Sequence, residues 1–562
     1  MNPLRTLLLC SALALALAYT TATAQALDDS LKAAVDSVFI DYNRTDAPGC
    51  ALGIYDEGDI LYAKGYGMAD LEGNVPITSR TVFDIASVSK QFTAASLILL
   101  EHKGKLSLED DVRDYIPELP DYGETITLRQ LVVHTSGLRD YIGLMQMVGV
   151  HINDVTTGED AFDYIVRQKA LNFEPGDEHL YSNSGYLLAA FIVERVSGLT
   201  LREFARKHIF EPLGMRHTTY IDDHTEIKPF RATGYGLTES GAFRRAVSNW
   251  EQNGDGAVFT TVEDLARWDR NFVEPSVGGE GFSSELMRPG VLANGDTLSY
   301  AHGLSHGQHR GFETIGHGGS WGGYRAHFLR VPSEGLSVAI LCNVASANPG
   351  ALAREVVDVV LAPDVDEADR EEESPEPVAI SQEEMERIAG RYRSSEHGEY
   401  RSIVLEDEQL YYEQRDDRWK LIPVGEGRFW REETPTARVL VERRAEEGES
   451  LTLEWREGDD ELYTLTAYEP WTPAADELEA FVGRYHSDEL ETAYTLTVEN
   501  DTLIAHHASH GQIALKPRET DVFTGEKWVL AHVAFDRDEA GQVEGFLVSI
   551  GRTRNLLFEK VE

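Results

Sequence analysis

A serine and a lysine three positions apart, Ser87 and Lys90, carry the clearest chemical signal in the sequence. They open an apolar run, residues 92–100, whose spacing predicts a helix. Positions i and i+3 share a helix face, so the lysine nitrogen can reach the serine oxygen. A serine hydroxyl becomes a nucleophile when a neighbouring base takes its proton, and a neutral lysine can be that base. Taken alone the pair is a near-chance match, because a capping serine and a surface lysine give the same letters.

Tyr181, Ser182 and Asn183 form a second candidate group on a short connection. A turn at Pro175-Gly176 precedes them, and an apolar helix is expected over residues 186–197. A phenol held near a lysine ammonium can become a phenolate, which makes Tyr181 a second candidate base. Asn183 can donate to a substrate carbonyl.

Residues 315–324 (IGHGGSWGGY) contain five glycines. Glycine is unfavourable inside an ordinary strand but suits a backbone that must approach a ligand closely. His317 would supply a neutral or cationic donor beside such a site.

Serine-lysine, tyrosine-any-asparagine and histidine-any-glycine follow one another in this order. With them, the chain resembles the penicillin-recognising serine hydrolases: class C β-lactamases, DD-carboxypeptidases, D-aminopeptidases and related esterases. The resemblance covers roughly residues 30–361. It includes residues 134–138 (HTSGL), 211–215 (EPLGM) and 254–268 (GDGAVFTTVEDLARW).

The resemblance implies an acyl-enzyme on Ser87, with Lys90 and Tyr181 sharing the base role. The oxyanion would be held by backbone N–H groups of Ser87 and Ser320, and Asn183, His317, Gly319 and Ser320 would bind substrate. His134 is expected to be a structural residue beneath the site.

His317 departs from the class C β-lactamases, which carry a lysine at that position, and instead is similar to D-aminopeptidases and some esterases. We therefore expect an exported peptidase or amidase of D-aminopeptidase or DD-peptidase type. A carboxylesterase, a weak β-lactamase and a penicillin-acylated sensor with little turnover stay open as alternatives. The implied partner is a small peptide, ester or β-lactam-like substrate, and a homodimer is left open.

These residues need a sheet and a helical lobe to position them. Residues 50–67 predict a β-hairpin turning at 56–59, and residues 309–313, 327–331 and 336–342 predict strands. Helices are predicted over 161–170, 186–197, 201–210 and 262–272. Strands at both ends with helices between them predict an α+β, β-lactamase/transpeptidase-like domain over residues 27–361.

An acidic, proline-bearing linker is predicted at residues 362–380. Beyond it, residues 385–392 (MERIAGRY) are echoed by residues 478–485 (LEAFVGRY), and each copy enters an alternating segment. Two small antiparallel, lipocalin-like β-barrels follow, at residues 381–468 and 474–562. Three-domain D-aminopeptidases resemble this arrangement, with a loop of the last barrel reaching the active site. Residues 506–511 are the expected counterpart.

The chain has 51 Lys+Arg against 96 Asp+Glu, a formal net charge of -45, which argues against nucleic acid and anionic lipid as partners. Residues 1–24 read as a cleavable signal peptide, and no later run is long enough to insert in a membrane, so a periplasmic or secreted protein is expected. Export would leave Cys50 and Cys342, compatible with a disulfide or with two buried thiols. His302, His306 and His309 lack metal-site spacing, and the sequence predicts no metal or cofactor.

Overall fold

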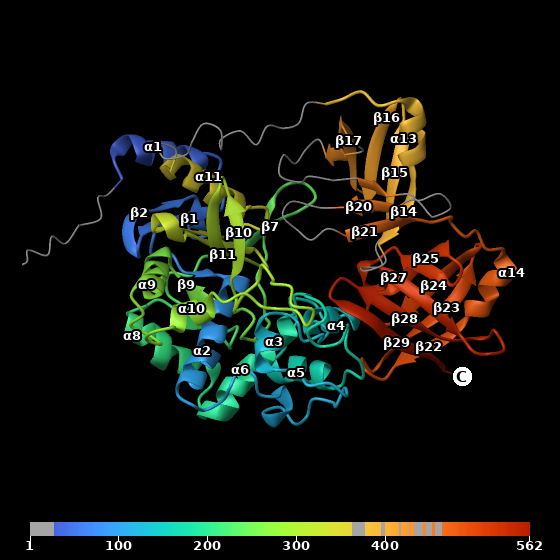
Figure 1. Cartoon of the computed structure of the whole chain (residues 1–562), viewed down its shortest axis with the longest axis horizontal. Helices are drawn as coiled ribbons and strands as arrows, with labels where there is room; N and C mark the ends of the chain where they lie inside the picture. The colour runs from blue at the N-terminus through green and yellow to red at the C-terminus, as the bar shows by residue number, and fades with distance from the viewer. Residues whose placement is uncertain are drawn as a thin grey trace, which may run out of the picture.

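The computed structural model describes residues 27–361, 377–394, 400–414, 417–425, 428–431, 442–444, 452–455 and 463–561. The predicted signal peptide and most of the predicted acidic linker therefore lie outside the described residues. Figure 1 shows the N-terminal domain on the left and two β-rich modules on the right.

A six-stranded antiparallel sheet forms the middle of the N-terminal domain. Its strands run in the order β10 (Ser305–His309), β11 (Phe312–Trp321), β12 (Tyr324–Val331), β13 (Leu336–Cys342), β1 (Cys50–Asp56), β2 (Asp59–Tyr66). The first and last strands of the domain are neighbours, as predicted, and the hairpin turn falls at residues 56–59. Cys50 lies directly opposite Cys342, and the two form a disulfide.

Helices cover both faces of this sheet. On one face α1 (Asp29–Val38) and α11 (Pro349–Leu361) bury their apolar residues against β1 and β13. The other face carries the helical lobe: α2 (Lys90–His102), α3 (Leu128–Val132), α4 (Tyr141–Met147), α5 (Gly158–Val166), α6 (Asn183–Ser197), α7 (Leu201–Ala205), α9 (Val262–Val273) and α10 (Phe282–Leu286). The α+β prediction for this domain is therefore confirmed.

Short strands complete the domain around the main sheet. β3 (Met68–Asp70) pairs with β4 (Val75–Pro76), β9 (Val258–Thr260) lies between β5 (Phe83–Asp84) and β6 (Thr219–Tyr220), and β7 (Tyr235–Leu237) pairs with β8 (Phe243–Arg245). The β5–β9 pairing matters for the site, because β5 leads directly into the segment that carries Ser87.

Two predicted elements of the N-terminal domain need correction. Residues 309–313 are not one strand: they comprise the end of β10, a turn at Arg310 and Gly311, which both take positive φ, and the start of β11. Such backbone angles end a ladder and reverse the chain. The helix predicted over residues 201–210 begins as α7 but continues as a π-helical turn, η3 (Arg206–Phe210), before α8 (Glu211–Leu213).

Over its described residues, the first C-terminal module is a curled, half-barrel sheet, where a closed barrel was predicted. After α13 (Gln382–Ile388) its strands are β14 (Gly390–Ser394), β15 (Tyr400–Glu406), β16 (Gln409–Gln414), β17 (Asp417–Gly425), β18 (Arg428–Arg431), β19 (Glu442–Arg444), β20 (Thr452–Trp455) and β21 (Tyr463–Ala467). β18 and β19 occupy the two edges, and within the described ranges no pairing joins them.

The second module is a closed eight-stranded barrel, as predicted. After α14 (Ala475–Leu478) and the turn η5 (Glu479–Phe481), its strands are β22 (Gly483–Ser487), β23 (Thr492–Glu499), β24 (Thr502–His507), β25 (Gly511–Glu519), β26 (Val522–Gly525), β27 (His532–Arg537), β28 (Val543–Ile550) and β29 (Thr553–Val561). β22 pairs with β29 to close it, and aromatic side chains such as Phe481, Tyr494 and Phe546 fill the interior. The barrel lies beside α4 and α5 (Figure 1), and Leu144 and Met147 of α4 join its apolar core.

The sequence repeat corresponds to one structural device used twice. In each module a short helical segment precedes a strand, and a buried tyrosine in that strand caps it. Tyr392 donates to the Ile388 carbonyl at 2.5 Å, and Tyr485 donates to the Phe481 carbonyl at 2.8 Å.

No single helix among the described residues is long and apolar enough to cross a bilayer; one bent pair, Asn183–Ser197 with Leu201–Leu213, meets that test by length and composition alone.

Candidate active site

Ser87 lies on a 3-10 turn, η1 (Ala86–Ser89), which runs directly into α2. Ala86 takes a positive φ of 46°, an uncommon conformation for a residue with a side chain. The Asp84 carboxylate holds this turn by accepting from the Ala86 N–H at 2.8 Å. The turn leaves Ser87 partly exposed while its neighbours are buried, so the hydroxyl faces a cavity.

Lys90 is fully buried, and its Nζ has three acceptors within hydrogen-bond distance. It donates to Ser87 Oγ at 3.1 Å, to Asn183 Oδ1 at 2.9 Å and to the Asp255 carbonyl at 2.7 Å. An ammonium has three N–H donors, and three acceptors satisfy it completely. The structure thus brings together Ser87, Lys90 and Asn183, which are far apart in the sequence.

Asn183 is the first residue of α6, and Asp140 fixes its orientation. Asp140 Oδ2 accepts from the Asn183 backbone N–H at 2.9 Å and from its side-chain Nδ2 at 2.8 Å. With Nδ2 held there, Oδ1 points to Lys90. Asp140 Oδ1 also caps α4 by accepting from the Ile142 N–H at 3.0 Å. Sequence reasoning missed Asp140, although it stands two residues after the 134–138 segment.

Tyr181 lies between two cations. Lys90 Nζ is 4.8 Å from the Tyr181 ring centroid, and the Arg552 guanidinium carbon is 4.5 Å from it. The His134 ring packs 4.1 Å away, and His134 Nδ1 accepts from the Ser182 N–H. Burial holds the pKa of His134 well below its ordinary value, so this imidazole is a neutral support beneath Tyr181.

His317 is buried, and both of its ring nitrogens are occupied. Nδ1 donates to the Gly318 carbonyl at 2.5 Å, and Nε2 then accepts from the Tyr300 hydroxyl at 2.9 Å. Burial first, and Lys90 second, lower the pKa of His317 to about 3. The sequence left open whether His317 is neutral or cationic. In the structure its imidazole is neutral, and both ring nitrogens are bonded to protein groups.

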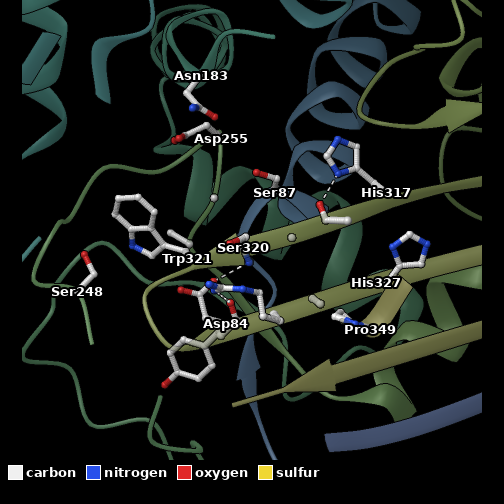
Figure 2. A pocket seen from close by; sticks show the side chains of 18 of the residues that line it. Asp84, Ser87, Asn183, Ser248, Asp255, His317, Ser320, Trp321, His327 and Pro349 are labelled. Carbon is white, nitrogen blue, oxygen red and sulfur yellow. Dashed lines mark hydrogen bonds between the residues drawn. The ribbon is translucent and has the colours of Figure 1, made fainter. Parts of the chain in front are cut away.

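The glycine-rich segment forms β11 and its turn into β12. A Cβ at Gly319 would lie 2.2 Å from the Ile85 carbonyl oxygen, so only glycine lets β11 pass this close to the turn that carries Ser87. Ser320 follows and is exposed. Figure 2 shows Asn183, Asp255, His317 and Ser320 arranged around Ser87.

Two buried carboxylates absent from the sequence predictions also line the cavity. Burial raises the pKa of Asp84 to about 6, with its bond from Ala86 opposing the rise. Burial also raises the pKa of Asp255, whose Oδ2 accepts from the Tyr141 hydroxyl at 3.0 Å. Asp255 lies within residues 254–268, one of the segments that carry the family resemblance, and this membership was the sequence signal that could have identified it.

The cavity has a volume of about 900 Å³. Its walls include Tyr141, Trp250 and Trp321 from the N-terminal domain and Arg552 from the second barrel. The prediction that residues 506–511 are the barrel loop reaching the active site was therefore wrong. Residues 506–511 pack elsewhere, with His510 Nε2 3.0 Å from the Met147 carbonyl, whereas the turn between β28 and β29 reaches the cavity.

His302, His306 and His309, which the sequence analysis rejected as metal ligands, each contact a separate protein group. His302 Nε2 accepts from Arg129, His306 Nε2 donates to the Met287 carbonyl, and His309 Nε2 lies 2.7 Å from Asp358. Elsewhere in the described chain, Asp223, His224 and Glu251 bring possible donor atoms together. There His224 Nδ1 is already 2.7 Å from Glu251.

Comparison with known proteins identifies two families in the chain. The beta-lactamase family matches residues 26–362, and a domain family of unknown function, DUF3471, matches residues 468–559. A penicillin-binding protein of Bacillus subtilis (strain 168) is 29% identical over 391 residues, covering 66% of this chain and 85% of the relative. A D-aminopeptidase of Brucella anthropi is 25% identical over 537 residues, covering 92% of this chain and 96% of the relative.

Among solved structures, the octameric penicillin-binding protein homologue from Pyrococcus abyssi has a TM-score of 0.54 at 20% identity, covering 86% of this chain and 99% of its own. At that identity the likeness concerns the fold. The family match spans more than half of the chain and contains the Ser87, Tyr181 and His317 motifs. The chain therefore belongs to the beta-lactamase family and is a serine hydrolase with a three-domain, D-aminopeptidase-like architecture.

Proposed function

We propose that this serine hydrolase forms an acyl-enzyme on Ser87 and cleaves small peptides or amides, as a peptidase or amidase of D-aminopeptidase or DD-peptidase type. The observation that carries the proposal is the hydrogen bond from Lys90 Nζ to Ser87 Oγ at 3.1 Å, in a cavity that Tyr181 and Asn183 share. The similarity to a D-aminopeptidase over nearly the whole chain supports an amide-type substrate.

In the acylation step, Ser87 Oγ attacks the substrate carbonyl carbon and its proton passes to the Lys90–Tyr181 pair. Lys90 Nζ lies 4.8 Å from the Tyr181 ring centroid, so two receivers of the proton stay open: a Tyr181 phenolate beside the Lys90 ammonium, or a neutral Lys90. Backbone N–H groups of Ser87 and Ser320 would stabilise the oxyanion, a contribution of about 10²–10³ in rate for each donor.

The tetrahedral intermediate then collapses. The bond to the amine breaks, the amine leaves with the proton returned by the Lys90–Tyr181 pair, and the acyl group stays on Ser87. Water repeats the sequence on the acyl-enzyme and releases the acid. Asn183, fixed by Asp140, holds Lys90 in place through both steps.

A substrate panel tests this function. Purified protein is assayed on D-alanyl anilides, D-Ala-D-Ala peptides, short-chain nitrophenyl esters and a chromogenic cephalosporin, beside Ser87→Ala. We expect turnover of the amide or peptide substrates and its loss in Ser87→Ala. Equal activity of the two proteins rules out Ser87 as nucleophile. Rapid turnover of the esters or cephalosporin alone would reassign the enzyme, and stable labelling by penicillin without turnover would make it a sensor.

We also propose that the protein is exported. The Cys50–Cys342 disulfide supports this, since such bonds persist in oxidising compartments. Expression of the full chain in a bacterial host followed by N-terminal sequencing tests it. Cleavage near Ala24 and recovery outside the cytoplasm are expected, whereas an intact N-terminus in the cytoplasmic fraction contradicts it.

A further inference from the structure

The turn between β28 and β29 is fixed to the N-terminal domain, which gives Arg552 a defined position in the cavity wall. The Arg552 carbonyl accepts from the Asp140 N–H at 3.3 Å and from Asn172 Nδ2 at 3.0 Å. Arg139 donates to the carbonyls of Arg554 and Asn555 just beyond it. The backbone from Arg552 to Asn555 is therefore held against the N-terminal domain.

The Arg552 guanidinium retains donors for a ligand. Its side chain is 48% exposed and lies over the Tyr181 ring, which Lys90 also contacts. In the described part of the chain, one carboxylate oxygen lies within 4 Å of it, Asp140 Oδ2 at 3.8 Å. That distance exceeds hydrogen-bond range, and Asp140 Oδ2 already accepts two bonds from Asn183.

The charge of the cavity is opposite to that of the protein. The whole chain carries a formal charge of -45, but the cavity lining contains the arginines 231, 325, 354 and 552 against the carboxylates of Asp84 and Asp255. Both carboxylates are buried and bonded to protein donors. A cationic hollow in an acidic surface concentrates anions and disfavours an ammonium.

His317 does not supply a charge on the β11 side of the nucleophile, because its neutral ring is bonded to Gly318 and Tyr300. The cations nearest Tyr181 are Lys90, whose three donors are occupied within the protein, and Arg552, whose guanidinium has no hydrogen-bond acceptor among the described residues. A substrate that binds between Ser87 and Tyr181 therefore lies beside the Arg552 guanidinium, which is the charged group free to contact it.

Resting on the function proposed above, we propose that Arg552 binds a carboxylate of the substrate, so that the enzyme prefers carboxylate-bearing peptides or amides to those with a free N-terminal ammonium. The second barrel thereby contributes a specificity-determining residue. A guanidinium pairs with a carboxylate through two parallel N–H donors, which suits a fixed arginine with unoccupied donors.

The test uses the full-length protein and matched substrate pairs. N-succinyl-D-alanyl p-nitroanilide is compared with its succinamide isostere, which places the carboxylate on the acyl side. D-alanyl-4-aminobenzoate is compared with D-alanyl-4-aminobenzamide, which places it on the leaving group. D-alanyl p-nitroanilide supplies the free amine. The readout is the ratio of kcat/KM for each acid to that of its neutral isostere.

We expect at least one acid to exceed its isostere by about 10- to 100-fold, the range for a hydrogen bond to a charged group. In Arg552→Gln this ratio falls toward one, in Arg552→Glu it inverts, and in Arg552→Lys part of it remains. Arg484→Gln, at an exposed arginine of β22 in the same barrel, is the matched control and keeps the full ratio.

Salt provides a measurement that needs no variant, since the wild-type ratio should fall as sodium chloride rises from about 0.05 to 0.5 M. A wild-type ratio near one for both pairs, an unchanged ratio in Arg552→Gln, or preference for the free amine overturns the inference. If Ser87 is required for every substrate in those cases, only this inference fails. If Ser87→Ala still cleaves the neutral isosteres, the proposed function fails instead.

Discussion

Asn183 turns its side-chain oxygen toward Lys90 because its amide nitrogen is bound to Asp140. Nδ2 lies 2.8 Å from Asp140 Oδ2, and Oδ1 lies 2.9 Å from Lys90 Nζ. The same carboxylate caps α4 and lies 3.8 Å from Arg552 of the second barrel. Asp140 thus links, through Asn183, the Lys90 ammonium to a helix of the lobe and to the second barrel.

Asp140→Asn tests this link. An amide can present its oxygen to only one side, so its NH₂ group must face either the Asn183 donors or the capped Ile142 N–H. We expect kcat/KM to fall about tenfold or more and the free energy of unfolding to fall by about 1–3 kcal/mol for the lost buried bonds. Burst and steady-state kinetics measure the first, and denaturant titration measures the second.

Asp28→Asn is the control for Asp140→Asn. Asp28 caps α1 in the same way, by accepting from the Leu31 N–H at 2.8 Å, but it is exposed. Asparagine caps helices as well as aspartate, so neither activity nor stability should change appreciably. If Asp140→Asn behaves like Asp28→Asn, Asp140 does not position Asn183.

Tyr181→Phe separates the phenol from the ring. The ring keeps its contacts with His134, Lys90 and Arg552, so the fold should be retained. If the phenol shares the Ser87 proton, kcat should fall by about 10²–10⁴. Tyr220→Phe removes a buried hydroxyl bonded to Thr93 at 2.7 Å and should lower Tm without that loss of kcat. Full activity in Tyr181→Phe would leave Lys90 as the base.

Two ion pairs that cross the same interface should differ in strength. Arg139 and Glu489 are buried and 2.7 Å apart, whereas Lys169 and Asp488 are exposed and 3.0 Å apart. Glu489→Gln leaves the Arg139 charge uncompensated and should cost about 3–5 kcal/mol, while Lys169→Gln should cost less than about 1 kcal/mol. Hydrogen exchange across the β28–β29 turn measures both. Equal protection in the two variants would show that the buried pair does not fix the barrel.

Acid should destabilise the protein through its buried histidines. Burial, followed by Arg129, lowers the pKa of His302 to about 4, so folded His302 stays neutral while the unfolded chain gains a proton below about pH 6.5. The unfolded state then binds more protons, and the free energy of unfolding falls between pH 6.5 and 4. The slope is at most about 1.4 kcal/mol per pH unit for each such histidine.

His302→Gln should make this slope shallower, as measured by urea titrations at several pH values. His102→Gln, at an exposed histidine, should leave the slope unchanged. Asp84, whose pKa is raised to about 6, contributes with the opposite sign but equally in all three proteins, so it cancels from the comparison. A slope in His302→Gln identical to wild type would mean that His302 is protonated when folded.

Local spacing was enough to predict much of the fold and the nucleophile. The i, i+3 relation of Ser87 and Lys90 is a property of one helical turn, and period-two and period-3.6 patterns predicted β1, β13, α6 and α9. The repeat predicted two β modules. The turn at residues 309–313 was mistaken for a strand because positive φ at Arg310, a residue with a side chain, has no reliable sequence signal.

Tertiary packing decided the rest. In the sequence, Asp84, Asp140 and Asp255 cannot be distinguished from surface aspartates. Their burial and their hydrogen-bond partners, which give them a role, depend on the tertiary structure. The disulfide was one of two alternatives until β1 and β13 placed Cys50 opposite Cys342. Arg552 is far from Ser87 in the chain, and no local pattern reports which barrel turn docks against α4. The sequence by itself therefore determined the candidate nucleophile and the order of motifs, which depend on neighbouring residues, whereas the charge and shape of the cavity depend on contacts between distant segments.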